Sequence, residues 1–260
     1  MDELKKHGGQ PRQADCSYGF GLGSANNLVL GERKTDTKSN EITAIPELLR
    51  VLDLTGTTVT IDAIGCQKSI ARQIVEQKGD YVQAVKENQP SLLADIKDSF
   101  QMLAADAVDE QTDGDHGRVE TRRCSVLADL SLIDNTQNWA SLQAIMRIEA
   151  TRYHKATGKQ ENETRCYITS LKPDAQRLNW AVRQHWGIEN KLHWVLDLAF
   201  GEDLSRKRAS HAAQNFSVLN RIAPNLIRKD KSFKGSIRGK RLQAAWYDAF
   251  LWLLLAEGKS

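Results

Sequence analysis

The chain has 260 residues, 40% of them hydrophobic and 27% charged, with 36 basic and 33 acidic side chains and a formal net charge of +3. This composition is typical of a globular protein that can bury a core. No apolar run reaches the roughly 18 residues of a transmembrane span, and the polar N-terminus lacks a signal-peptide core. We therefore expect a cytoplasmic protein without a membrane partner.

The charge is unevenly distributed along the chain. Residues 201–260 carry a net charge of +7, whereas residues 1–200 carry −4. A basic C-terminal region on a mildly acidic body suits a polyanion partner, and it equally suits a solvated basic surface.

The first half of the sequence alternates between strand-like and helix-like stretches. Residues 1–25 are rich in glycine and polar residues without a regular period, so we expect a loop or a disordered segment there. Beyond them, the predicted strands are 28–30, 57–63 and 80–86, and the predicted helices are 39–52, 66–79 and 91–103. This alternation favours an α/β fold with a partly parallel sheet.

The second half has a different texture. Three β-rich stretches, 115–127, 142–153 and 164–171, follow one another without helices and predict antiparallel strands. A long amphipathic helix is predicted over 174–198, and a basic, helical tail over 201–260.

Asp62 is the first candidate functional residue. It follows the β-branched run Thr58–Ile61, so it lies where a strand ends. In open α/β sheets, ligands bind at the carboxyl ends of the strands. Asp62 could bind a metal, act as a base, or simply cap the next helix.

Glu189 is the second candidate. It lies on the edge of the apolar stripe of the helix 174–198, four residues after His185 and three before Leu192. A carboxylate at such a position must be paired, protonated or bound to a metal. The alternative to a metal is an internal salt bridge, for instance with Arg183 or Lys191. Together, Asp62 and Glu189 suit a site for divalent metal ions.

Polar and aromatic residues near Glu189 could contact nucleic acid. A second stripe on the same helix could stack on bases and bind phosphates or could serve packing, and it consists of Trp186, Asn190, His193 and Asp197. A charged cluster follows, which could contact a DNA backbone or could be the charge pattern of a helix start: Glu202, Asp203, Arg206, Lys207 and Arg208. On the strand 115–127, Arg118, Glu120 and Arg122 share one face, as a polar surface ladder or as phosphate contacts.

Several long motifs resemble the ISAs1 family of bacterial insertion-sequence transposases, which includes the H-repeat-associated proteins. They are "KTDTKSNEITAIPELLRVLDLTGTTVTIDAIGCQ", "GDYVQAVKENQ", "DHGRVETRR" and "RQHWGIENKLHWVLDLAFGEDLSRKR". The resemblance runs from about residue 24 to the C-terminus.

The resemblance implies an RNase H-like mixed sheet with flanking helices and a DDE triad of two aspartates and a glutamate. Asp62 matches the second aspartate and Glu189 the glutamate, and the triad binds two Mg²⁺ or Mn²⁺ ions. Residues 26–260 would form this domain, with a β-rich insertion at about 112–172 and basic C-terminal helices at about 201–260. The implied partner is DNA, at the element ends and the target, in a nucleoid-associated protein that could form a homo-oligomer. We expect DNA contacts from Lys86, Arg118, Trp186, Asn190, Lys191, His193, Arg206, Lys207 and Arg208.

The first aspartate of the family has no match in this sequence. The family places it in a motif like "AIDGKTLRGS", and Asp2, Asp15 and Asp36 lack that context. We therefore expect an N-terminally truncated transposase whose DNA cleavage and strand transfer are lost or impaired. The alternative is a non-catalytic remnant that binds DNA or oligomerises. A structural α/β protein whose carboxylates only cap and pair is a third reading.

Overall fold

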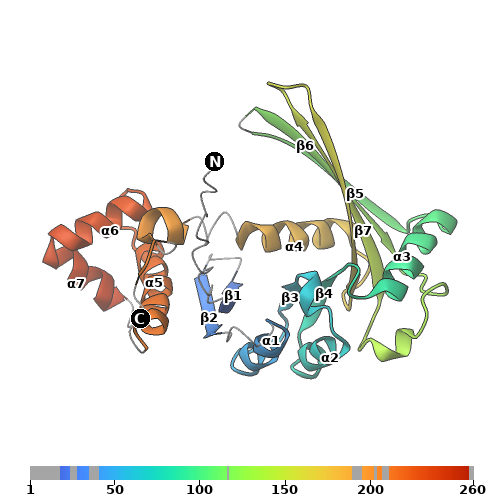
Figure 1. Ribbon diagram of the computed structural model, residues 1–260, viewed down its shortest axis with the longest axis horizontal. Coiled ribbons are helices and arrows are strands. Elements are labelled where there is room, and N and C mark those ends of the chain that lie inside the picture. Colours follow the sequence, from blue (N-terminus) through green and yellow to red (C-terminus); the bar gives the residue numbers. More distant parts are fainter. Residues whose placement is uncertain are drawn as a thin grey trace, which may run out of the picture.

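A computed structural model describes residues 18–23, 28–34, 41–115, 117–188, 195–201, 204–206 and 211–257. Its centre is a six-stranded sheet with the strand order β3-β4-β8-β7-β6-β5 (Figure 1). The strands are β3 (Thr58–Ile61), β4 (Asp80–Val85), β5 (Ala107–Asp115), β6 (Arg118–Leu127), β7 (Ala144–His154) and β8 (Gln160–Thr169). Strands β3 and β4 are parallel, and every other neighbouring pair is antiparallel.

Helices cover both faces of this sheet. Three of them, α1 (Glu41–Arg50), α2 (Lys68–Glu76) and α3 (Pro90–Met102), pack on one face, and α4 (Ala175–Ile188) packs on the other. The prediction of a mixed α/β sheet with flanking helices is therefore confirmed, and the arrangement is consistent with an RNase H-like fold.

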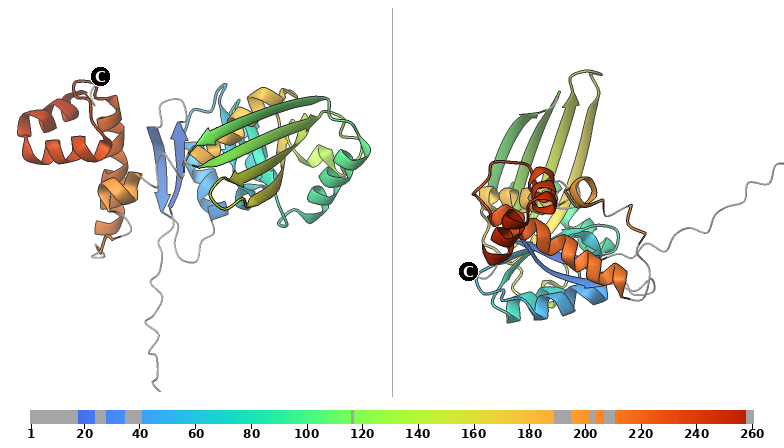
Figure 2. Two further views of the ribbon diagram at one scale, coloured as in Figure 1. Left: turned by 90° about the horizontal axis from the view of Figure 1, so that it is seen from above. Right: turned by 90° about the vertical axis from the view of Figure 1, so that its left-hand side faces the viewer.

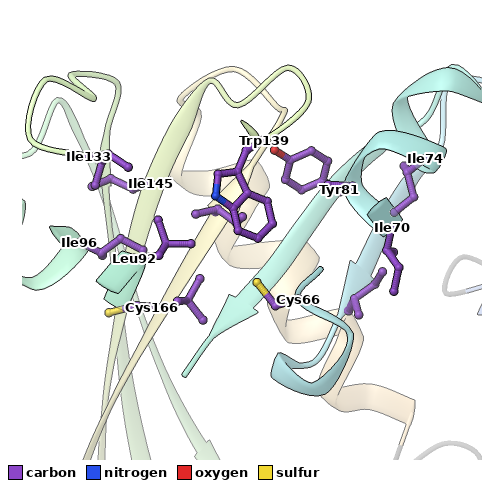
Figure 3. Packing of buried hydrophobic residues seen from close by; sticks show 14 of the residues in the cluster. Cys66, Ile70, Ile74, Tyr81, Leu92, Ile96, Ile133, Trp139, Ile145 and Cys166 are labelled. Carbon is purple, nitrogen blue, oxygen red and sulfur yellow. The ribbon is translucent and has the colours of Figure 1, made fainter. Parts of the chain in front are cut away.

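The larger core lies under α1, α2 and α3. Strand β4 sends Tyr81 and Val85 into it, where they meet the apolar faces of the helices and of β7 and β8 (Figure 3). The neighbouring residues Val82 and Ala84 point to the opposite face, toward α4. Because successive side chains of a strand alternate between faces, a strand buried on both sides must be apolar throughout, as β4 nearly is.

The burial and polarity of the side chains change along the length of strands β6, β7 and β8. Their inner ends carry buried residues such as Val126, Met146 and Ile168. Their outer ends extend past α4 (Figure 1) and carry charged and polar side chains. Burial on both faces at the inner end therefore gives way to a polar surface at the outer end.

Two strands were not predicted from the sequence. Strand β1 (Tyr18–Gly23) pairs antiparallel with β2 (Leu28–Lys34), so the expectation of a loop over residues 1–25 is wrong for 18–23. Its three glycines suggested a loop, but glycine also adopts extended backbone, and the pairing supplies backbone hydrogen bonds. Strand β5 was missed because its sequence AVDEQTDGD is mostly acidic and polar.

The predicted helix 174–198 is α-helical over Ala175–Ile188. Its predicted continuation over 189–194 lies outside the described residues. A π-helical turn, Leu196–Phe200, follows and ends at Gly201 with φ +63°, a left-handed conformation that glycine adopts without strain.

The C-terminal region consists of the helices α5 (Ala212–Lys229), α6 (Ile237–Trp246) and α7 (Asp248–Glu257). They lie at one end of the molecule, and the β1–β2 hairpin lies between them and the main sheet (Figure 2). Their small core contains Ile227, Phe250 and Leu254. Within the described residues, no helix is both long and apolar enough to span a membrane.

Candidate functional site

Asp62 lies directly after β3, in a short turn. It caps the 3-10 turn Ala63–Gly65, and its Oδ1 accepts a hydrogen bond of 2.7 Å from the Ala63 backbone N–H. The capping role considered from the sequence is thus present. Since 48% of the Asp62 side chain is exposed, the carboxylate can also reach a ligand from solvent.

Residues that follow β4 brace this turn. Asn88 donates from Nδ2 to the Ala63 carbonyl oxygen at 2.5 Å, and Gln89 donates from Nε2 to the Cys66 carbonyl oxygen at 2.8 Å. The ammonium of Lys86 lies 3.9 Å from Asp62 Oδ1. Because β3 and β4 are parallel, both strands end at the same edge of the sheet. That is why the segment after β4 meets the turn after β3.

A hydrogen bond ties this edge of the sheet to α4. Thr60 Oγ1 and His185 Nδ1 are 3.1 Å apart. Thr60 lies two residues before Asp62, and His185 lies four residues before Glu189. Sequence reasoning placed His185 on the buried stripe of the helix but could not supply its partner, 125 residues away.

A second feature lies on the other side of the end of α4. An open cavity of about 460 Å³ separates α4 from the outer halves of β6, β7 and β8. Pairs opposite one another in the sheet share a face, as Glu120 and Arg152 do. The charged lining residues are Arg118, Glu120, Arg122, Arg152, Glu161, Glu163, Arg165 and Arg183, and His154 lies among them.

Ion pairs connect the charged residues of the cavity. Glu120 contacts Arg122 at 2.9 Å and Arg152 at 3.7 Å, and Glu163 contacts Arg165 at 2.6 Å. Burial acts to raise the pKa of Glu120, but the charges of Arg122 and Arg152 outweigh it and hold that pKa below its ordinary value. The carboxylate is therefore charged at neutral pH.

Aromatic groups close the inner end of the cavity. The guanidinium carbon of Arg165 lies 3.8 Å from the centre of the Trp186 ring, in the range of a cation–π contact. Trp186 is edge-on to His185, with ring centres 5.5 Å apart. His185 bonds to Thr60 and Trp186 lines the cavity, so adjacent residues of α4 contact the strand before Asp62 and the cavity.

The structure groups the described candidates into two sets. Lys86 lies beside Asp62, and Arg118 and Trp186 line the cavity. Arg206 is exposed. The remaining predicted site residues lie outside the described residues: Glu189, Asn190, Lys191, His193, Lys207 and Arg208. Four residues near these two sets were not predicted from the sequence, because only strand pairing and register bring them to these places: Asn88, Gln89, Arg152 and Arg165.

Comparison with known families identifies the class of protein to which this fold belongs. The family described as "Transposase DDE domain" matches residues 20–226, and the chain belongs to this family. Members of the family generally use divalent metal ions.

Relatives in Escherichia coli support this assignment. The chain is 41% identical over 239 residues to YbfL and 40% identical over 242 residues to YhhI, named an H repeat-associated putative transposase, both of strain K12. It is 39% identical over 240 residues to YncI of strain O157:H7. Each match covers 89% of this chain but only 61% to 63% of the relative, so the chain spans less than two thirds of their length.

Among the described residues, no group of three or more His, Cys, Asp or Glu side chains is arranged to hold a metal ion, so Asp62 by itself can contribute one ligand to a divalent cation. A carboxylate at a strand end, half exposed and with Oδ1 fixed by a backbone N–H, can offer an oxygen ligand of the kind that Mg²⁺ and Mn²⁺ prefer. Lys86, at 3.9 Å, balances the carboxylate charge from one side and leaves the solvent side accessible.

Proposed function

We propose that this chain derives from an insertion-sequence DNA transposase of the ISAs1 type, and that Asp62 and Glu189 bind Mg²⁺ or Mn²⁺ in it. The observation that carries the proposal is the hydrogen bond between Thr60 and His185. It fastens the strand that leads to Asp62 onto the helix that leads toward Glu189. With family membership, this supports a shared metal site for the two carboxylates.

The chemistry follows from the positions of these groups. Bound divalent ions would activate water and stabilise the leaving oxygen in phosphoryl transfer. Asp62 supplies a carboxylate whose direction is fixed by the Ala63 N–H. Asn88 and Gln89 keep the turn in place.

We further propose DNA as the partner, at element ends and target sites. Lys86 beside Asp62, and Arg118 and Trp186 in the cavity, support contacts on both sides of α4. The proposed DNA-binding surface extends along the chain to Asn190, Lys191, His193, Arg206, Lys207 and Arg208. The protein would act in the cytoplasm, on the nucleoid, and as a homo-oligomer.

The printed 260 residues contain no match to the family's first aspartate motif. Loss of one carboxylate weakens a metal site and its geometry. We therefore propose that this chain alone has little or no strand-transfer activity. The same observation favours a second candidate function, a non-catalytic remnant that binds DNA or oligomerises.

Manganese binding tests the proposal without requiring turnover. Titration of the chain with Mn²⁺, followed by electron paramagnetic resonance, should show a site that Asp62→Asn and Glu189→Gln each weaken at least tenfold, since each removes a ligand. The matched control is Asp53→Asn, because Asp53 is exposed and also caps a backbone N–H, that of Thr55. Equal affinity in all four proteins would refute the metal site.

An activity assay separates the two functions. Little strand transfer in Mg²⁺ or Mn²⁺, together with DNA binding that survives Asp62→Ala and Glu189→Ala, supports the remnant. Metal-dependent cleavage that either substitution abolishes supports the enzyme. Strand transfer at the level of an intact transposase would contradict the proposed impairment.

A further inference from the structure

The cavity between α4 and strands β6, β7 and β8 contains hydrogen-bond donors that the described part of the chain does not use. Among the described residues, Arg122 Nη1, Trp186 Nε1 and Tyr167 Oη are buried and make no hydrogen bond of acceptable geometry, although Trp186 and Arg165 lie close enough to the Tyr167 hydroxyl to act on its pKa. All three residues line the cavity. Buried polar atoms without partners are uncommon in proteins, because each costs the free energy of its lost hydration.

These three groups share one chemical property. Arg122 Nη1 and Trp186 Nε1 can only donate hydrogen bonds. Burial raises the pKa of Tyr167 despite the neighbouring Arg165 and Trp186, so its hydroxyl keeps the proton and can donate as well. These three groups of the cavity therefore require a hydrogen-bond acceptor.

The carboxylates of the cavity that the structure describes do not meet that need. Glu120 and Glu163 already contact two arginines each, and Glu161 contacts Lys159 and His154. Asp113 holds Arg183 at 2.6 Å near the rim. Five arginines thus face four carboxylates, so the site keeps a positive excess. An anionic acceptor from outside the chain can satisfy the donors.

We propose that this cavity binds a phosphodiester group of a DNA strand, with Arg122, Tyr167 and Trp186 donating to its non-bridging oxygens. A phosphodiester supplies the negative charge and the acceptor oxygens, and arginine forks match its geometry. The volume of about 460 Å³ is within the usual range for a small-ligand site. The cavity is open, so the strand can continue on either side of the bound group. The inference rests on the proposed function, because it takes DNA as the ligand.

The substitution Tyr167→Phe tests this with minimal disturbance. It removes only the hydroxyl, which makes no hydrogen bond of acceptable geometry among the described residues, so the fold should keep its stability. Binding of a fluorescein-labelled oligonucleotide, measured by fluorescence anisotropy in EDTA, should weaken about tenfold, the value of one hydrogen bond to a charged group.

The chain offers a matched control for this change. Tyr81 is also buried, and its hydroxyl also lacks a partner, but it lies in the core on the opposite face of the sheet (Figure 3). Tyr81→Phe should leave binding unchanged. Equal affinities of Tyr167→Phe and the wild type, or equal losses in both variants, would overturn the proposal.

Arginine substitutions provide a second arm. Arg122→Lys keeps the charge but loses the guanidinium fork, and it should weaken binding severalfold. Arg147→Lys is its control, since Arg147 also has a buried nitrogen without a partner but stacks over Phe100, in the core under α1, α2 and α3. Equal effects of the two changes would contradict the site.

The chemistry of the probe separates phosphate contacts from base contacts. On an oligonucleotide with a neutral methylphosphonate backbone, the difference between the wild type and Tyr167→Phe should disappear. A difference that persists there would overturn the phosphodiester as the ligand.

The two proposals can fail separately. Asp62→Asn should bind DNA in EDTA at least as well as the wild type, because its site needs a metal. A wild-type chain that binds no DNA would overturn both proposals. Binding that Tyr167→Phe leaves intact would overturn only this one.

Discussion

The last turns of α4 separate two sites of opposite chemistry. On the side of β3, Asp62 presents a carboxylate that is half exposed and held by a backbone N–H. On the side of β6, β7 and β8, the cavity is lined by arginines, a tyrosine and a tryptophan, and some of their hydrogen-bond donors have no acceptor among the described residues. One side offers acceptors and the other offers donors.

This difference suits the proposed phosphoryl transfer on DNA. Acceptor oxygens hold divalent cations, and donors hold the phosphates of the strand to be positioned. His185 and Trp186, adjacent in α4, face the two sides. The helix therefore couples the placement of the two sites, and each substitution below disturbs the helix or one side of it.

The largest expected effect comes from the helix itself. Leu178 is fully buried in α4, and Leu178→Ala should cost about 3 kcal/mol of unfolding free energy. Urea denaturation measures it. The control is Leu204→Ala, at a residue that is 85% exposed, with a change within about 0.5 kcal/mol. A similar loss in both variants would mean that α4 does not pack as described.

A smaller effect is expected from the turn on the carboxylate side. A Cβ added to Gly65 would clash with Ile61 Cγ2 and Ile45 Cδ1, so Gly65→Ala should cost about 2 kcal/mol through overpacking. It should also disturb Mn²⁺ binding while DNA binding in EDTA persists. Gly114→Ala, where an added Cβ meets nothing within 4 Å, is the control. Unchanged stability and Mn²⁺ affinity in Gly65→Ala would contradict the close packing of the turn.

Asn88→Ala removes one brace of the same turn. Loss of the bond to the Ala63 carbonyl should cost about 1 kcal/mol and weaken Mn²⁺ about tenfold, as outer partners of metal ligands do. Calorimetry measures the affinity. Asn162→Ala, on the outer part of β8, should leave it unchanged. An effect of equal size there would show that the brace is not specific to Asp62.

The smallest effect concerns the charges around the cavity. The arginines lower the pKa of Glu120 in the folded state despite its burial, so its charged form stabilises the fold above its unfolded pKa of about 4.5. Glu120→Gln should cost about 1 kcal/mol at neutral pH. The gap to the wild type should shrink as the pH falls below about 4.5. Urea titrations from neutral to acidic pH would refute this if the gap grew instead.

The sequence was informative where one strand or one helix decides the matter. Asp62 lies at a strand end and caps a turn, as its position after Thr58–Ile61 predicts. The apolar stripe of α4 was also predicted, and Leu178 and Val182 are buried. Hydrophobic periodicity carries this information, because it reports which face of an element meets a core.

The sequence did not predict the contacts between segments that are far apart in the chain. Nothing in the sequence pairs Thr60 with His185, or Asn88 with the Ala63 carbonyl. The cavity depends on the register of three antiparallel strands, and a shift of one residue would turn its arginines to the other face. Strand β5 was missed because its polar sequence hides the period on which prediction relies.

Iron-mediated cleavage tests the shared metal site most directly. Fe²⁺ that replaces the bound ion generates hydroxyl radicals with ascorbate and peroxide, and these cut the polypeptide near the metal. Mass spectrometry should find cuts both near Asp62 and near Glu189 in the wild-type chain, and neither set in Asp62→Asn. Cuts near only one residue, or a pattern that Asp62→Asn leaves unchanged, would contradict the shared site.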